Sequence, residues 1–206
     1  QGVDIRVGGN GLIRRCDAHP LHASLRLQLP RNGQGEPGGA FHRGYAGALI
    51  EAIDLASSAP TGRIKAVLED RSGGVWVATA LQGLMRIDNR DSEYSLLPAA
   101  PDAPANASAL HEDADGTIWI GTEEGRLYKH GAGNFQRVRT DRDIGGAVRA
   151  LLRDRDGNLW IATTGAGLFR LNGSHLVSLD SGSVPSNDVR VLLEDVEGSL
   201  WVGSYG

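Results

Sequence analysis

The sequence is poor in the residues that mark several classes of protein. Cysteine occurs once among 206 residues, as Cys16, so no disulfide can form within the chain. No apolar run approaches 18 residues, and the sequence therefore predicts no membrane-spanning helix. The formal net charge of −4 provides no basic excess of the kind that a nucleic-acid surface requires. A hydrophobic content of 40% is ordinary for a globular protein.

Glycine, in contrast, is abundant, and its 29 residues predict many tight turns between short strands. Four segments align on tryptophan, at spacings of 43, 41 and 41 residues. An aspartate stands six residues before each Trp and a glycine three before it. The repeated residues are Asp70, Asp113, Asp154 and Asp195, then Gly73, Gly116, Gly157 and Gly198, then Trp76, Trp119, Trp160 and Trp201. Such a period indicates a β-propeller or a related array.

The third repeat shows the four strands that we expect in each unit. They are residues 148–154, 159–163, 167–171 and 175–179, separated by Asp-Gly and Gly-rich turns. The first strand is apolar on both faces, with Val148, Ala150 and Leu152 on one and Leu151 on the other, which fits a strand packed between two sheets. Four antiparallel strands make one propeller blade. We therefore predict an all-β fold, a partial β-propeller of about four blades.

The stretch ALLRDRDGNLWIATTGAGLFRL, residues 150–171, resembles the two-component regulator propeller repeat. That family has the pattern D-x-x-G-x-(apolar)-W-(apolar)-G-T, followed by G-(apolar)-x-R. The resemblance covers residues 63–206. It implies an extracytoplasmic, periplasmic sensor region of a bacterial signalling protein, such as a sensor histidine kinase or a diguanylate cyclase. It implies no particular ligand.

The N-terminal third fits the repeat poorly. Residues 1–30 match a degenerate half-blade, in which Arg6 stands in the Trp position. Residues 31–62 break the period, and we expect a linker or insertion there, with a short helix within residues 46–58. Residues 63–206 hold three full blades and the start of a fourth. Two arrangements remain open: a slice of a larger propeller, which we favour, and a four-bladed ring in which the N-terminal half-blade completes the last blade.

The D-x-D-G turns raise the question of calcium, because Asp113 and Asp115 resemble the start of a calcium loop. The distant glutamate of such a loop is missing, however. The first Asp and the Gly recur in every repeat at the position of a hairpin turn, and in the first repeat the second acid is replaced by Ser72. We therefore predict a structural turn, and neither a metal nor a cofactor.

A basic column is the strongest candidate for ligand binding. Eleven residues before each Trp stand Lys65, Ser108, Arg149 and Arg190, near the entry of each first strand. Because arginine binds anions bidentately, the column suggests a small-molecule or oligosaccharide ligand, with an acidic sugar among the candidates. The alternative is that these cations pair with acids of neighbouring blades or face solvent. The predicted ligand-binding residues are Lys65, Arg149, Arg190, Asn187, Asp188, Glu123 and Glu124.

Three functions compete. We favour a non-catalytic sensor module that transmits ligand occupancy to an output domain. The second is a propeller enzyme, a lyase or hydrolase acting on polysaccharides or lactones, for which Glu123, Glu124 and His111 are the residues to test. The third is a protein-interaction scaffold that self-associates through open blade edges.

Overall fold

The computed structural model describes residues 5–7, 24–26, 40–45, 48–54, 63–90, 93–98, 101–179 and 186–205. These residues form strands and turns, without a helix. The chain divides into two compact units. Unit 1 comprises Gln1–Gly11 with Ala100–Gly206, and unit 2 comprises Leu12–Ala99. The all-β prediction is confirmed.

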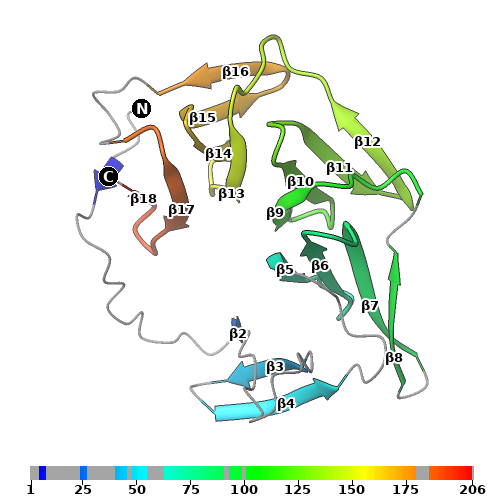
Figure 1. The fold of residues 1–206 in the computed structure, drawn as a ribbon. Coiled ribbons are helices and arrows are strands. Elements are labelled where there is room, and N and C mark those ends of the chain that lie inside the picture. Colours follow the sequence, from blue (N-terminus) through cyan, green and yellow to red (C-terminus); the bar gives the residue numbers. More distant parts are fainter. Residues whose placement is uncertain are drawn as a thin grey trace. The chain divides into compact units, whose positions relative to one another are not determined.

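Unit 1 contains two complete four-stranded antiparallel sheets and one smaller sheet. The first is blade A, with β9 (Ala107–Glu112), β10 (Ile118–Thr122), β11 (Leu127–Gly131) and β12 (Asn134–Val138). The second is blade B, with β13 (Ala147–Arg153), β14 (Leu159–Thr164), β15 (Gly167–Asn172) and β16 (His175–Ser178). Blade C has β17 (Val189–Glu194) and β18 (Leu200–Ser204). Figure 1 shows the three side by side, with β9, β13 and β17 at corresponding positions.

The blades of unit 1 pack face to face, as a propeller requires. Strand β13 contacts β9 and β10, and β17 contacts β13 and β14. One apolar cluster lies between blades A and B and includes Ala109, Leu151 and Ile161. A second lies between blades B and C, where Trp160 packs with Val202. Blade B is therefore buried on both faces, and each buried large apolar side chain contributes about 1.5–3 kcal/mol.

One face assignment within β13 is corrected. Val148 belongs to the cluster that contains Leu151, whereas Ala150 and Leu152 pack against the other cluster. The reason is a β-bulge between Val148 and Ala150, which adds one residue to the strand and reverses the alternation.

The third strand beside blade C comes from the N-terminus. Strand β1 (Ile5–Val7) pairs in parallel with β18, and Arg6 lies opposite Trp201. The sequence places Arg6 at the Trp position of a degenerate half-blade in residues 1–30, and that half-blade stays a prediction. The parallel pairing of β1 is possible because the free edge of β18 presents backbone donors and acceptors to an extended segment of either polarity.

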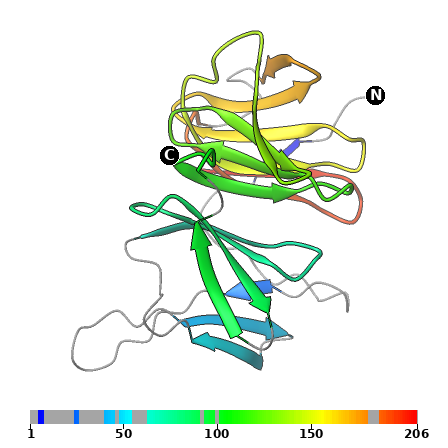
Figure 2. The same ribbon diagram turned by 90° about the vertical axis from the view of Figure 1, so that its right-hand side faces the viewer.

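Unit 2 contains a further complete blade and a three-stranded sheet. The blade has β5 (Ile64–Glu69), β6 (Val75–Thr79), β7 (Leu84–Arg90) and β8 (Glu93–Pro98). The smaller sheet has β2 (Ser24–Arg26), β3 (Ala40–Tyr45) and β4 (Ala48–Asp54). Figure 2 shows β3 and β4 as a hairpin.

The short helix expected within residues 46–58 is wrong over Ala48–Asp54. These residues form β4, which pairs antiparallel with β3 from Ala40 opposite Asp54 to Tyr45 opposite Ala48. The apolar residues of this stretch fit a helical spacing, but pairing with a neighbouring strand overrides so weak a local preference. Residues 46–47 and 55–58 lie outside the described part of the chain.

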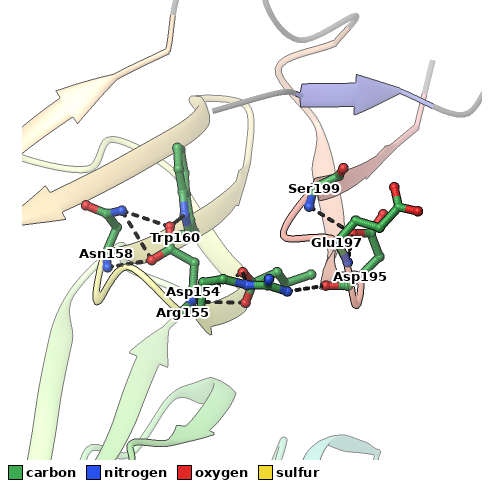
Figure 3. A network of polar contacts seen from close by, with 8 residues as sticks. Asp154, Arg155, Asn158, Trp160, Asp195, Glu197 and Ser199 are labelled. Carbon is green, nitrogen blue, oxygen red and sulfur yellow. Dashed lines mark hydrogen bonds and ion pairs between the residues drawn. The ribbon is translucent and has the colours of Figure 1, made fainter. Parts of the chain in front are cut away.

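The repeated aspartate holds the indole in every blade, and in the unit 2 blade and blades B and C its other oxygen also accepts an N–H of the turn. The indole Nε1 of Trp76, Trp119, Trp160 and Trp201 donates to the Asp six residues earlier, at 2.8, 2.7, 2.7 and 2.7 Å. In blade B the other oxygen of Asp154 accepts the backbone N–H of Asn158 at 2.7 Å (Figure 3). Burial raises the pKa of Asp154, but the hydrogen bonds from Asn158 and Trp160 outweigh it and hold the pKa below its ordinary value.

The repeated glycine completes the same turn. Gly73, Gly116, Gly157 and Gly198 have φ of 84°, 84°, 83° and 90°. This is the left-handed region that glycine adopts at little cost. The carboxylate oxygens of the Asp column accept hydrogen bonds from the indole and from the turn or, in blade A, from Arg153 of the next blade, as expected of structural turns.

Candidate functional site

The first strand of every blade carries a β-bulge at the basic column. The pairing skips Lys65 in β5, Ser108 in β9, Arg149 in β13 and Arg190 in β17. A bulge leaves one residue out of the ladder and re-aims its side chain. The four side chains of the column are thus placed by one backbone irregularity that recurs in each blade. The sequence located this column but gave no sign of the bulge.

Arg149 joins two blades at this end of the strands. Its Nε donates to Oγ1 of Thr164 at 2.8 Å, within blade B. Its Nη1 lies 3.8 Å from Oε1 of Glu123, in the turn that follows β10 of blade A. Both side chains of this ion pair are about one-third exposed, at 32% and 36%. The structure therefore brings together Arg149 and Glu123, two residues that the sequence singled out separately.

Arg190 pairs with Asp188 on blade C. Its Nε and Nη2 donate to the two carboxylate oxygens of Asp188 at 3.1 and 2.7 Å. Its guanidinium lies over the ring of Tyr205, 5.4 Å from the centroid. The hydrogen bonds from Arg190 lower the pKa of Asp188, with smaller contributions from Thr164 and Arg149. Asp188 is thereby linked to the cations of both blade B and blade C.

The polar row formed by Glu123, Arg149, Thr164, Asp188 and Arg190 runs across three blades. We call it the rim row. Its charged members alternate in sign and sum to zero. Arg149 is paired with an acid of the neighbouring blade, as in the alternative interpretation of the basic column, whereas Arg190 is paired with Asp188 of its own blade. An anionic ligand at the rim row would compete with Glu123 and Asp188 for the two guanidinium groups.

The remaining predicted residues have other surroundings. The carbonyl of Asn187 accepts the N–H groups of Gly165 and Gly167, each at 2.9 Å, so its backbone joins blade B to the segment before blade C. Glu124 accepts a hydrogen bond from the side chain of Asn106. Burial raises the pKa of Glu124, but this hydrogen bond, together with those from the Glu124 backbone and Thr122 and the charge of Arg126, holds the pKa below its ordinary value. Lys65 belongs to unit 2 and is half-buried in β5.

Sequence reasoning missed Thr164 and Tyr205. Both stand four residues after the Trp, in the column that Glu123 occupies in blade A. Backbone pairing fixes this column beside the bulge: the N–H groups of Glu123 and Tyr205 donate to the carbonyls of Asn106 and Asp188, at 3.0 and 2.9 Å. An alignment of this column across the four repeats would have pointed to both residues.

The residues of the enzyme hypothesis do not gather in one place. Glu123 lies against Asn106, just before β9 begins, whereas His111 stands five residues further along that strand. Since His111 lies opposite Trp119, four residues before Glu123, the two positions are separated by roughly 13 Å at about 3.3 Å per residue. Within the described ranges, no group of three or more His, Cys, Asp or Glu side chains is arranged to hold a metal ion. The described residues also include no helix long and apolar enough to cross a membrane.

Sheets of four antiparallel strands that repeat about every 41 residues, packed face to face, define a β-propeller repeat protein. The model of the two component regulator propeller family matches three segments, residues 102–124, 144–165 and 183–206. Three segments of this chain thus match the repeat of the two component regulator propeller family.

Solved structures show the same fold. One is the extracellular domain of BT4673 from B. thetaiotaomicron, described as a hybrid two component system, with a TM-score of 0.60 and 20% identity over 81% of this chain. The extracellular domain of BT3049 from the same organism gives 0.57 and 18% over 87%. This chain spans about a quarter of those domains, 24% and 25%.

Virginiamycin B lyase from Staphylococcus aureus also matches, with a TM-score of 0.60 and 16% identity over 89% of this chain and 68% of the lyase. At such identities the likeness concerns the fold alone. No curated protein sequence matches the chain.

Proposed function

We propose that this chain is part of the sensor propeller of a bacterial signalling protein, and that it binds a ligand at the rim row outside the cytoplasm. The family repeats and the likeness to extracellular domains of two-component proteins support the class. The observation that carries the ligand site is the bulge that recurs in every blade and places one polar side chain at the same end of each first strand.

The proposed ligand is a small molecule or oligosaccharide rich in hydroxyl groups. The rim row offers donors from Arg149 and Arg190 beside acceptors from Glu123 and Asp188. A hydroxyl group both donates and accepts, so a neutral sugar can bind without breaking either ion pair. An acidic sugar must displace a carboxylate first. The alternating charges therefore favour a neutral ligand over the anionic one that the basic column alone suggested.

The module is proposed to be non-catalytic. The separation of Glu123 from His111 along the sheet supports this proposal over a shared active site of these two residues. The lyase neighbour supports a shared fold only, and it does not assign a reaction to this chain.

The test is a calorimetric binding screen of matched neutral and uronate-containing oligosaccharides against the 206-residue chain. We expect a hit that is lost in the double variant Arg149→Ala plus Arg190→Ala. Arg155→Ala is the control, because Arg155 follows β13 at the end opposite Arg149. A ligand that binds the double variant as tightly as the wild type would overturn the site.

A scaffold function has one observation in its favour. The outer face of blade C exposes Val191, Leu193 and Trp201, by 47%, 45% and 39%. The corresponding Trp160 of blade B is only 2% exposed, because blade C covers it. Self-association through this face predicts a sedimentation coefficient that rises with concentration and falls back in Trp201→Arg. A concentration-independent coefficient would exclude it.

A further inference from the structure

A histidine occupies a leucine position at the joint between blades A and B. His111 stands eight residues before Trp119, where the other repeats have Leu68, Leu152 and Leu193. Its side chain is 21% exposed. The backbone N–H of Arg153, on the neighbouring blade, donates to its Nε2 at 3.2 Å. Nε2 therefore carries no proton in this arrangement, and the neutral ring holds its proton on Nδ1.

The same joint contains an acid that faces two basic groups. Asp113 Oδ1 accepts a hydrogen bond from Nε of Arg153 at 2.6 Å, and it lies 3.6 Å from Nε2 of His111. Asp113 Oδ2 is held by the indole of Trp119 at 2.7 Å. The guanidinium of Arg153 lies over the Trp119 ring, 5.4 Å from its centroid. Arg153 is thus one polar connection between blades B and A, beside the Arg149–Glu123 ion pair and the hydrogen bond from Ser108 to the carbonyl of Val148. We call the set of His111, Asp113, Trp119 and Arg153 the His111 joint.

We propose that the His111 joint is an acid-sensitive connection between two blades. A proton taken from water by Nε2 turns this atom from an acceptor into a donor. The N–H of Arg153 then loses its acceptor, and the imidazolium faces the Arg153 guanidinium with like charge. The new Nε2–H reaches for Asp113 Oδ1, 3.6 Å away, and competes with Arg153 for it. An ion pair between blades is thereby exchanged for one within blade A, and the joint loosens.

The charges around His111 fix the direction of the effect. Burial lowers the pKa of His111, Asp113 raises it, and Arg153 lowers it, with a net pKa below the ordinary 6.5. Below pH 6.5 the unfolded chain therefore binds this proton more readily than the folded one. The stability contributed by neutral His111 is complete above pH 6.5 and is lost as the pH falls through the range between the two pKa values.

The joint between blades B and C has a different polar connection. Nε of Arg155 donates to Oε1 of Glu194 at 2.8 Å. Nη2 of Arg155 donates to the carbonyl of Asp195 at 2.7 Å (Figure 3). Leu152 takes the position of His111 there. We call this the Arg155 joint. It serves as an internal control, because its polar connection contains no histidine.

The experiment compares the wild type with His111→Leu by urea unfolding at half-unit steps from pH 7.5 to 5.0. Leucine is the residue of the other three repeats, so this variant is expected to fold. As the pH falls below 6.5, we expect the wild-type unfolding constant to rise relative to that of the variant by about three- to tenfold per pH unit. His175→Leu is the control variant, since His175 is 77% exposed and is expected to leave the wild-type pH dependence in place.

A second measurement reports on the joint itself. In the wild type, the amide resonance of Arg153 should shift with the same midpoint as the His111 ring, and the amide of Arg155 should stay constant. An Arg153 amide that does not move while His111 titrates would overturn the partner exchange. Equal pH dependence in the wild type and His111→Leu would overturn the proposal as a whole. Both outcomes are independent of ligand binding at the rim row.

Discussion

The His111 joint and the Arg155 joint use the same apolar columns but opposite polar connections. In the His111 joint, Arg153 of the later blade reaches back to Asp113 of the earlier one. In the Arg155 joint, Arg155 of the earlier blade reaches forward to Glu194 of the later one. Arg153 and Glu194 even occupy the same repeat position, seven residues before Trp. The charge at that position is inverted between the two blades.

This difference separates what the repeat specifies from what each joint adds. The apolar columns and the Asp–Trp hydrogen bond recur in every blade, so they define how a blade is built. The arginine connections stand at variable positions, so they distinguish one joint from the next. A joint with its own polar contact can therefore have its own response to conditions, as proposed for His111.

The largest expected difference in stability is between substitutions of a buried tryptophan and of a partly exposed one. Trp160→Ala should destabilise the chain by about 3–5 kcal/mol, because Trp160 is buried between blades B and C. Trp201→Ala should cost less than half of that, since Trp201 is 39% exposed. Urea unfolding followed by circular dichroism measures both. Equal losses would mean that the outer face of blade C is covered in solution.

The next contrast compares two glycines at the same repeat position, of which only Gly121 lies against a neighbouring blade. A Cβ at Gly121 would lie 2.3 Å from Cγ1 of Val148 on the neighbouring blade, so Gly121→Ala should cost about 1–3 kcal/mol. Gly203 holds the same repeat position in blade C, and its nearest contact for a Cβ is Val191 of its own blade at 3.3 Å. Gly203→Ala should therefore cost under about 1 kcal/mol. The two unfolding midpoints give the comparison, and a larger loss at Gly203 would contradict the packing described for the joint.

The smallest contrast is between the two arginine connections. Arg153→Met should cost about 1–2 kcal/mol, because its partner Asp113 is only 11% exposed. Arg155→Met should cost at most about 1 kcal/mol, since that side chain is 49% exposed. Two double-mutant cycles isolate the coupling energy of each pair. One combines Arg153→Met with Asp113→Asn, and the other combines Arg155→Met with Glu194→Gln. A stronger coupling in the Arg155 joint would reverse the ranking proposed here.

The sequence predicted well the segments that occur in four copies and poorly the segments that occur only once. In blade B, the strands expected at 159–163 and 167–171 are observed at Leu159–Thr164 and Gly167–Asn172. The period alone makes this possible, because four copies average out local ambiguity. The segment Ala48–Asp54 had no second copy to compare with, and its local pattern suggested a helix where pairing with β3 makes a strand.

The candidate site, too, was predicted only where its residues stand in a repeated column. Arg149, Arg190 and Asp188 stood out by charge and spacing, and the structure places them in the rim row. The pairing of Arg149 with Glu123 depends on the approach of two blades, which no single repeat encodes. The Asp–Trp hydrogen bond was also missed, although its fixed spacing of six residues was visible in every repeat.

The recurring bulge has a consequence for how such a protein can change over time. A residue left out of the ladder has no cross-strand neighbour to fit, so Lys, Ser and Arg are all accommodated at this position in four blades. Ser108 is buried and donates to the carbonyl of Val148 on the neighbouring blade, whereas Arg149 and Arg190 reach the rim row. The same backbone position thus serves packing in one blade and polar chemistry in another, and specificity can vary blade by blade without a change in the cross-strand ladder.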